Sequence, residues 1–283
     1  MIGVVIVSYK NFDGTVDFIN NQLNKISLPL KVVVVDNCSD VQQGAMMAAA
    51  CNGICVANEN ERVCSNDSIF ILPKAENLGF ARGNNLGADF LLRNFECEYL
   101  LFTNDDILIE DTMVLDKLIE CLSNREIGAV GPRVIGVDGN EQSPHHRVIT
   151  PMRQLGWKFL PFLRKKKRTN SEVSGIQVPQ SSHCYWVSGC FFLMKATDFK
   201  AVNGFDPSTF LYAEEVILAE RLKGIGKREY FCADTYVVHY GGASTQSIQS
   251  KKLKKILKES NCIYYRNYLH SNRFIVWLYR MFC

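Results

Sequence analysis

The chain lacks an apolar run long enough to cross a bilayer. Its longest apolar stretch near the C-terminus, residues 274–279, falls far short of the ~20 residues that a membrane-spanning helix needs. It also lacks a strong charge of either sign, since the formal net charge is only +3. Such a small excess argues against nucleic acid as a general partner. We therefore expect a protein that does not cross a membrane and does not bind nucleic acid.

The chain also lacks a CxxC pair, so no structural zinc site is expected. Its eleven cysteines are an odd number in a long chain, and an apolar strand rather than a signal peptide occupies the first residues. These features favour reduced thiols over a disulfide framework. We therefore expect a cytoplasmic protein.

A further absence concerns cofactors. The segment after the first predicted strand reads VSYKN at residues 7–11 and has no GxGxxG turn. A nicotinamide enzyme is therefore disfavoured, although Asp36, at the end of the second predicted strand, is the kind of acid that binds a ribose. On its own, Asp36 fits a turn or a helix cap equally well.

What is present is an alternation of strands and helices. Runs of β-branched residues that are apolar on both faces predict buried parallel strands at 2–7, 32–35, 69–72 and 99–102. Helices are predicted around 42–50 and at 80–93 and 112–123, where apolar residues fall on one side. This alternation predicts an α/β domain with a mostly parallel sheet and helices on both faces.

The pattern changes beyond residue 125. A strand is predicted at 129–135, a helix at 214–223, and two short strands at 228–232 and 236–238. Residues 144–182 mix Pro, Ser and basic residues without a period, which predicts an irregular loop over the active face. We predict a catalytic domain at 1–245, divided at about residue 125, and a basic, aromatic C-terminal extension at 246–283.

Two segments carry candidate chemistry. The strand at 99–102 runs into Asn104, Asp105 and Asp106, and a strand end of this kind can present carboxylates to a divalent metal. The segment 77–85 opens a helix, so that its backbone N–H groups and Arg82 can face a diphosphate. Taken alone, acids after a strand more often mark an ordinary solvated turn, and the segment 77–85 fits a turn and a ligand loop equally.

Seven motifs in order resemble family 2 glycosyltransferases of the GT-A fold, in particular bacterial rhamnosyltransferase-like enzymes of polysaccharide biosynthesis. The motifs are VSY at 7–9, VDN at 35–37, NLGFARGNN at 77–85, NDD at 104–106, GFD at 204–206, FLYAEE at 210–215 and HYGGAS at 239–244. The resemblance covers roughly residues 1–245. It implies a Rossmann-like nucleotide-binding half at 1–125 and an acceptor-binding half at 126–245.

The resemblance also implies roles for individual residues. Asp106 and His239 would bind Mn²⁺ or Mg²⁺, and Asn104 stands where the family often has the first acid of an Asp-x-Asp motif. Glu215 would be the catalytic base, with Glu214 beside it, although the family more often has Asp at that position. Ile217 stands where the family often has a further acid. The positions implied to contact the nucleotide sugar are Ser8, Tyr9, Asp36, Asn77, Gly79, Arg82, Asn84, Asn104 and Asp105.

The implied activity is inverting transfer of a sugar from a UDP- or dTDP-linked donor to a hydroxyl of a bacterial glycan or lipid-linked glycan. Two other functions stay open from the residues alone. Asn104 in place of an acid, together with Ile217, leaves open a nucleotide-sugar-binding or inactive homologue. Taken alone, Glu214 and Glu215 also fit a negative first helical turn. A nucleotidyltransferase is less favoured, because it needs a Gly-rich phosphate loop after the first strand.

Basic runs at 164–168 and 251–255 lie beside apolar and aromatic residues. This combination predicts peripheral attachment to the inner face of the cell membrane through the region 154–168 and the C-terminal tail. The tail is equally consistent with packing on the catalytic domain or with a dimer contact.

Overall fold

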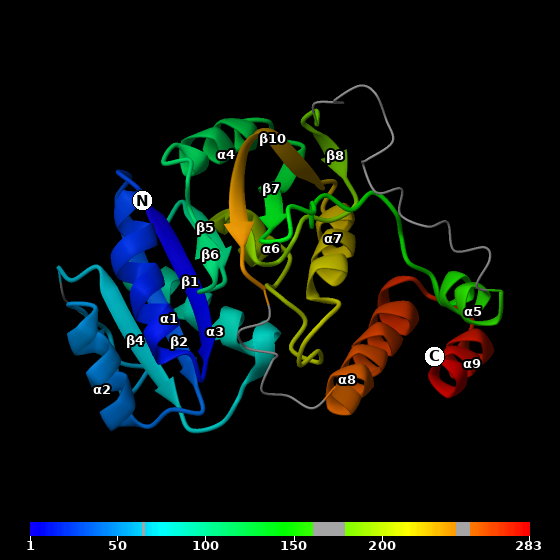
Figure 1. Cartoon of the computed structure of the whole chain (residues 1–283), viewed down its shortest axis with the longest axis horizontal. Helices are drawn as coiled ribbons and strands as arrows, with labels where there is room; N and C mark the ends of the chain where they lie inside the picture. The colour runs from blue at the N-terminus through cyan, green and yellow to red at the C-terminus, as the bar shows by residue number, and fades with distance from the viewer. Residues whose placement is uncertain (64–65, 161–178, 242–249) are drawn as a thin grey trace.

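The computed structural model describes residues 1–63, 66–160, 179–241 and 250–283. These residues form one sheet of ten strands in the order β3-β4-β2-β1-β5-β9-β7-β10-β6, with β8 paired to β10 (Figure 1). The strands are β1 Ile2–Tyr9, β2 Leu30–Asn37, β3 Ile54–Cys55, β4 Ile69–Lys74, β5 Tyr99–Thr103, β6 Ile107–Leu108, β7 Ile127–Gly136, β8 Ser182–Cys184, β9 Phe191–Lys195 and β10 Arg228–His239.

Helices cover both faces of this sheet. Within the described ranges, no helix combines the length and apolar content needed to cross a membrane. The helices are α1 Phe12–Asp17, α2 Val41–Ala50, α3 Gly79–Asn94, α4 Val114–Leu122, α5 Pro151–Phe159, α6 Ala196–Ala201, α7 Glu214–Gly224, α8 Ser250–Ile263 and α9 Arg273–Phe282, with short helical turns η1 Phe18–Gln22, η2 Leu23–Lys25 and η5 Tyr264–Tyr268.

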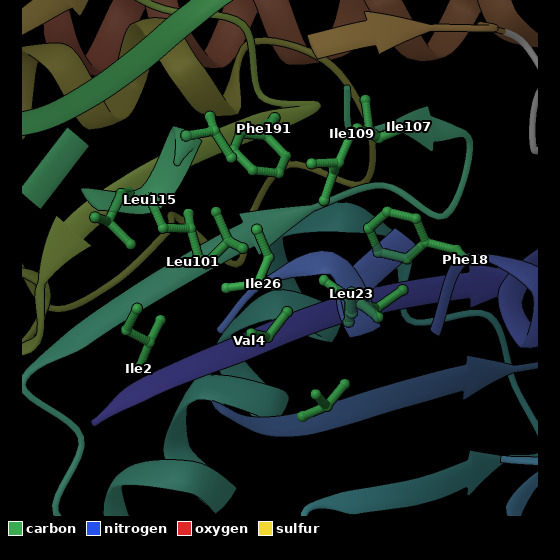
Figure 2. Close-up of a cluster of buried hydrophobic side chains, with 14 of the residues drawn as sticks. Ile2, Val4, Phe18, Leu23, Ile26, Leu101, Ile107, Ile109, Leu115 and Phe191 are labelled. Carbon is green, nitrogen blue, oxygen red and sulfur yellow. The ribbon is translucent and has the colours of Figure 1, made fainter. Parts of the chain in front are cut away.

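The strands are apolar on both sides because both sides are buried. Successive side chains of a strand point to opposite faces, so Val4 of β1 joins one core cluster and Val5 joins the other. The first cluster places Phe18 and Leu23 against β1, as Figure 2 shows, and includes Leu115 of α4. The second cluster lies under α3, α6 and α7.

The predicted α/β alternation is confirmed in the first half of the chain. Strand β1 pairs in parallel with β2 and β5, and β2 pairs in parallel with β4. The second half is mixed, since β9 runs antiparallel to both β5 and β7. The two short strands expected at 228–232 and 236–238 are one strand, β10, with an irregularity between Cys232 and Tyr236.

The prediction of a loop throughout 144–182 is wrong for its described part. Helix α5 begins after Thr150, whose side chain accepts a hydrogen bond from the backbone of Arg153, and Pro151 occupies its first turn. Strand β8 follows at its far end. Residues 161–178, including the basic run 164–168, lie outside the described residues.

The predicted C-terminal helical extension is present as α8, η5 and α9. A third core cluster joins Tyr264, Tyr265 and Val276 of the extension to Leu155 of α5 and Ile217 of α7. Tyr264 and Tyr265 are almost completely buried. The extension therefore packs on the catalytic domain, as one of the sequence-based alternatives proposed.

Candidate active site

A cavity of about 340 Å³ lies where the carboxyl ends of the parallel strands meet the start of α7. The ends of β1, β2 and β10 contribute to it, together with the segments after β5, before α3 and before β9. In α/β sheets, ligands bind outside the carboxyl ends of the strands. The cavity occupies the position that the fold favours for a ligand.

The cavity brings together residues that the sequence analysis singled out from distant segments. The predicted site residues that line it are Tyr9, Asn77, Gly79, Asn104, Asp106, Glu214, Glu215 and His239. Five predicted positions do not line it: Ser8, Asp36, Arg82, Asn84 and Asp105.

Asp106 and His239 meet because β6 pairs with the end of β10. His239 is the register partner of Ile107, and the backbone N–H of Tyr240 donates to the carbonyl of Asp106. As a result, His239 Nε2 lies 3.2 Å from Asp106 Oδ1. The other ring nitrogen, Nδ1, donates to Gln142 Oε1 at 2.7 Å, which fixes the ring orientation.

The electrostatics of this pair favour a cationic group beside Asp106. Burial alone would lower the pKa of His239, but hydrogen bonds and charges from Asp106 and Cys190 outweigh it and raise the pKa to about 10. The side chain of Asn104 lies 3.5 Å from His239 Nε2. Within the described residues, no group of three or more His, Cys, Asp or Glu side chains is arranged to hold a metal ion.

Asp105 turns away from the cavity into a buried polar network. Thr15 Oγ1 donates to Asp105 Oδ2 at 2.6 Å and lies 2.8 Å from Ser8 Oγ. Burial and the charge of Asp106 raise the pKa of Asp105, while the hydrogen bond from Thr15 opposes this shift. Ser8 and Asp105 thus tie the ends of β1 and β5 to α1 and allow Asp106 to face the cavity.

Of the other three positions outside the lining, Arg82 and Asn84 support nearby backbone. Asp36 is buried, and desolvation raises its pKa against a hydrogen bond with Ser39. Arg82 is exposed and donates to the carbonyl of Leu78, and the amide of Asn84 donates to the carbonyl of Phe80. The last two bonds hold the first turn of α3.

The loop before α3 is built around a glycine that no other residue can replace easily. Gly79 has φ +76°, and an added Cβ would lie 2.2 Å from the carbonyl oxygen of Phe210. Asn37 Oδ1 accepts from the backbone of Leu78, and Phe80 N donates to the carbonyl of Phe210. The loop is thereby joined both to the end of β2 and to the segment that precedes α7.

Glu214 and Glu215 form the first turn of α7, after a strained backbone. Tyr212 and Ala213 have φ of +73° and +68°, a conformation that costs non-glycine residues of order 1–3 kcal/mol each. Strain of this kind persists only where surrounding contacts impose it. This backbone conformation turns both carboxyl groups toward the cavity at a helix N-terminus, where negative charge is favoured.

Both glutamates titrate above the ordinary range. Burial, followed by the charge of Glu215, raises the pKa of Glu214 to about 8. Burial also raises the pKa of Glu215, although backbone N–H groups of Glu215 itself and of Gly189 act against this shift. Glu214 Oε1 has no hydrogen-bond partner among the described residues. Carboxyl groups with raised pKa values are suited to proton transfer near neutral pH.

Sequence reasoning missed the segment Ser188, Gly189 and Cys190, which lines the cavity before β9. An added Cβ at Gly189 would lie 2.5 Å from Glu215 Oε1, so the carboxylate rests directly against this glycine. The buried Glu229 holds the same segment by accepting from Val187 N at 2.7 Å. The only sequence feature here is a glycine before an apolar strand, which indicates no chemistry.

The extension braces the segment that carries the glutamates. Ser260 Oγ of α8 donates to the carbonyl of Leu211 at 2.8 Å, and Tyr268 OH donates to Asp206 Oδ2 at 2.7 Å. Ile217 is fully buried against the extension, in the same cluster as Tyr264. This packing explains why an apolar residue stands at that position, since an acid there would be buried.

The glycosyl transferase family 2 model matches residues 3–192. The rhamnosyltransferase WbbL of Escherichia coli strain K12 is 25% identical over 202 residues, covering 69% of this chain and 73% of that protein. An N-acetylglucosaminyl-diphospho-decaprenol L-rhamnosyltransferase of Mycobacterium tuberculosis (strain CDC 1551 / Oshkosh) is 26% identical over 188 residues, covering 63% of this chain and 61% of that protein.

Structural similarity extends further along the chain than the family match. The mannosyltransferase PcManGT of Pyrobaculum calidifontis, solved with GDP-Man and Mn²⁺, has a TM-score of 0.58 at 13% identity and covers 96% of this chain and 65% of that one. At this identity the likeness concerns the fold alone. The region that the family model matches, residues 3–192, contains Asp106 but ends before Glu214, Glu215 and His239. The chain belongs to glycosyl transferase family 2 and has the expected GT-A fold.

Proposed function

We propose that this protein is a metal-dependent, inverting glycosyltransferase that acts from a UDP- or dTDP-linked sugar on a hydroxyl of a bacterial glycan or lipid-linked glycan. One observation carries the proposal. The pair Asp106 and His239 and the pair Glu214 and Glu215 line the same cavity, so a group that binds metal and a group that accepts a proton can face one substrate.

The residues at the proposed metal site fit Mn²⁺ or Mg²⁺. They offer a carboxylate oxygen and an imidazole nitrogen 3.2 Å apart, close to the ~3 Å expected between adjacent ligands of an octahedral ion with bonds of about 2.1 Å. Binding would release the proton that His239 Nε2 holds beside Asp106. Two protein ligands suffice for such ions when substrate phosphates supply further oxygens. A bound cation would neutralise charge that develops on the departing diphosphate.

In the proposed reaction, Glu215 takes the proton of the acceptor hydroxyl as its oxygen forms a bond to the anomeric carbon. The bond from that carbon to the donor diphosphate breaks, and the nucleoside diphosphate leaves with the electron pair. A single displacement from the opposite side inverts the anomeric configuration. Gly189 and the first turn of α7 hold the Glu215 carboxylate for this step.

The donor-binding residues are also a proposal. Those that line the cavity, namely Tyr9, Asn77, Gly79 and Asn104, contact the nucleotide sugar. Ser8, Asp36, Arg82, Asn84 and Asp105 support the strand ends and the loop that carry them. The names of the two relatives favour a deoxyhexose such as rhamnose, so a dTDP-linked deoxyhexose is the first donor to test.

The substitution Asp106→Ala tests the metal site. The parent protein should gain thermal stability from UDP or dTDP only with Mn²⁺ or Mg²⁺, by ~2.7 kcal/mol at a ligand concentration a hundred times Kd. Asp106→Ala should fold and lose this gain. Asp105→Asn is the contrasting variant, because it should weaken the network with Thr15 and lower stability while the metal dependence persists. Unchanged metal dependence of nucleotide binding in Asp106→Ala would exclude Asp106 as a metal ligand.

Donor turnover separates an enzyme from a binding protein. With Mn²⁺ and a panel of nucleotide sugars, the parent should release free nucleoside diphosphate, at least slowly by hydrolysis, whereas a binding protein should only retain the donor. Release of pyrophosphate from a nucleoside triphosphate and a sugar phosphate would instead indicate a nucleotidyltransferase.

The placement of the protein in the cell is part of the same proposal. A lipid-linked acceptor would be met at the cytoplasmic face of a membrane, where a peripheral protein has access to it. The division into a nucleotide-sugar half at 1–125, an acceptor half at 126–245 and an extension at 246–283 is likewise proposed, and a stable dimer stays an open alternative for the extension.

A further inference from the structure

The charge of the chain is concentrated in its C-terminal extension. Residues 250–283 contain eight Lys or Arg and one Glu, a net charge of +7, whereas the whole chain carries +3. The remaining 249 residues therefore carry a net charge of −4. The neighbouring helix α5 adds Arg153 and Lys158 to the basic end of the molecule.

Exposed apolar side chains gather in the same place. Sixteen large apolar side chains are exposed among the described residues, and eight of them lie in or directly after α5 or in α8 and α9. These helical segments make up a small part of the chain. The eight are Met152, Phe159, Leu160, Leu257, Phe274, Trp277, Met281 and Phe282.

Helix α9 is apolar on two sides, and protein packing accounts for only one of them. Val276 and Tyr279 are buried against the third core cluster. Phe274, Trp277 and Met281, at helical spacing, are 64%, 51% and 61% exposed. A soluble helix that packs on one side normally carries polar residues on the other, so this second apolar side indicates a binding surface.

Aromatic contacts join α9 and α5 into one surface. Phe282 lies edge to face with Phe159 at 5.5 Å, and Phe274 stacks on Trp277 at 5.7 Å. We define the outward face by its exposed side chains Met152, Phe159, Phe274, Trp277, Met281 and Phe282. Figure 1 shows α5 and α9 together at one end of the molecule, at the opposite end from α2.

Basic groups lie beside this outward face. Arg273 and Arg280 of α9 are exposed. Lys158 and Lys258 lie close enough to Cys283, after the last turn of α9, for their charges to oppose the rise in its pKa that burial causes. Lys258 Nζ also donates to the carbonyl of Arg280, which places α8 beside the last turn of α9. The exposed lysines Lys251, Lys252, Lys254 and Lys255 continue the positive charge along α8.

We propose that the outward face docks on an anionic lipid bilayer. Trp, Phe and Met enter the boundary between headgroups and acyl chains, and the neighbouring Lys and Arg side chains contact acidic headgroups. The surface uses only described residues and leaves the buried side of the extension free to brace the segment before α7. Docking would give the enzyme access to a lipid-linked acceptor, and this purpose rests on the proposed function. Lipid binding itself can be measured without any catalysis.

Vesicle co-sedimentation tests the apolar part of the surface. The full-length protein should sediment with vesicles of phosphatidylcholine containing about 30% phosphatidylglycerol at low salt. Phe274→Ser combined with Trp277→Ser should weaken the partition coefficient at least about tenfold. The matched control, Val41→Ser with Met46→Ser on α2, removes side chains that are 54% and 59% exposed and should change nothing.

Charge variants test the basic part of the surface and do not disturb the core. Lys251→Glu with Lys255→Glu should weaken sedimentation, as should raised salt or vesicles of phosphatidylcholine alone, whereas Lys200→Glu on α6 should not. Donor hydrolysis in solution should stay unchanged in all these variants, so loss of lipid binding and failure of the proposed activity are distinguishable.

Three results would overturn the proposal. One is a parent protein that stays in the supernatant with anionic vesicles at low salt. Another is equal loss of binding in the α2 control and the α9 variant. The third is light scattering that shows a dimer which Phe274→Ser with Trp277→Ser converts to a monomer, without vesicle binding in either form; the outward face would then be a contact between two copies of the chain.

Discussion

The two sides of the cavity are positioned by different means. On the side of the proposed metal site, called the metal side below, Asp106 and His239 are set by regular strand pairing, through β5, β6 and β10. On the base side, Glu215 is set by a left-handed backbone at Tyr212 and Ala213, by contact with Gly189 and by a hydrogen bond from Ser260 to the adjoining loop. The metal side follows from the sheet, whereas the base side depends on contacts between segments that are distant in sequence.

This difference has an energetic consequence. Strand pairing places Asp106 and His239 without backbone strain, while positive φ at Tyr212 and Ala213 costs of order 1–3 kcal/mol each. The buried tyrosines and Ile217 of the third core cluster supply packing that can offset such a cost. The base side should therefore respond to changes in the extension, and the metal side should not.

The largest effect should come from Glu215, the proposed base. Glu215→Gln keeps the shape of the side chain but cannot accept a proton, so kcat should fall by ~10² to 10⁴ while the affinity for nucleotide and metal stays unchanged. Steady-state transfer assays with titration of donor measure both quantities. Glu214→Gln should lose less activity, and the reverse order would assign the base role to Glu214.

The next effect tests whether Gly189 positions Glu215. Gly189→Ala places a methyl group against the carboxylate, and a displacement of about 1 Å can cost as much as ~10² in kcat. Metal-dependent nucleotide binding should persist, because Asp106 and His239 are set by other contacts. Gly156→Ala in α5, where an added Cβ meets nothing within 4 Å, is the control and should be fully active. An equal loss of nucleotide binding in Gly189→Ala would mean that the two sides are not independent.

The pH dependence of stability should reveal the raised pKa of the buried Glu214. Its pKa is about 8 in the folded protein against an ordinary 4.5, so the folded state holds a proton that the unfolded state releases between these values. Its contribution to stability is full below pH 4.5 and is lost as pH rises toward 8. Glu214→Gln removes this loss, so its advantage should grow to about 4 kcal/mol by pH 8.

Thermal unfolding from pH 4 to pH 9 measures this effect. The exposed residue Glu126 provides the control, and Glu126→Gln should follow the parent across the range. A constant difference between Glu214→Gln and the parent at every pH would show that folding does not raise the pKa of Glu214.

The smallest effect should come from the hydrogen bond between the extension and the segment before α7. Ser260→Ala removes one hydrogen bond to the carbonyl of Leu211, worth about 1 kcal/mol, and substitutes no residue that lines the cavity. Transfer should weaken modestly while metal-dependent nucleotide binding remains at the parental level. If both change together, or if neither changes, the extension does not act on the base side. Ser271→Ala, elsewhere in the extension, serves as the comparison variant.

Local patterns in the sequence were sufficient to predict the first half of the fold. The runs in β1, β2, β4 and β5 are apolar on both faces, which only strands buried between helices can accommodate, and all four were predicted. Helix α5 was missed because its fold depends on one cap at Thr150 and on packing of Leu155 against the extension, neither of which leaves a long periodic pattern.

For the candidate site, the sequence by itself determined the family, the residue types and the order of the motifs, including Asp106, Glu215 and His239. Only the tertiary structure decided that Asp105 turns away toward Thr15, that Gly189 supports Glu215, and that Ile217 faces the extension. The physical reason is the range of the interactions. Strand and helix periodicities are local properties of the chain, whereas these three contacts join segments whose distance depends on the complete fold.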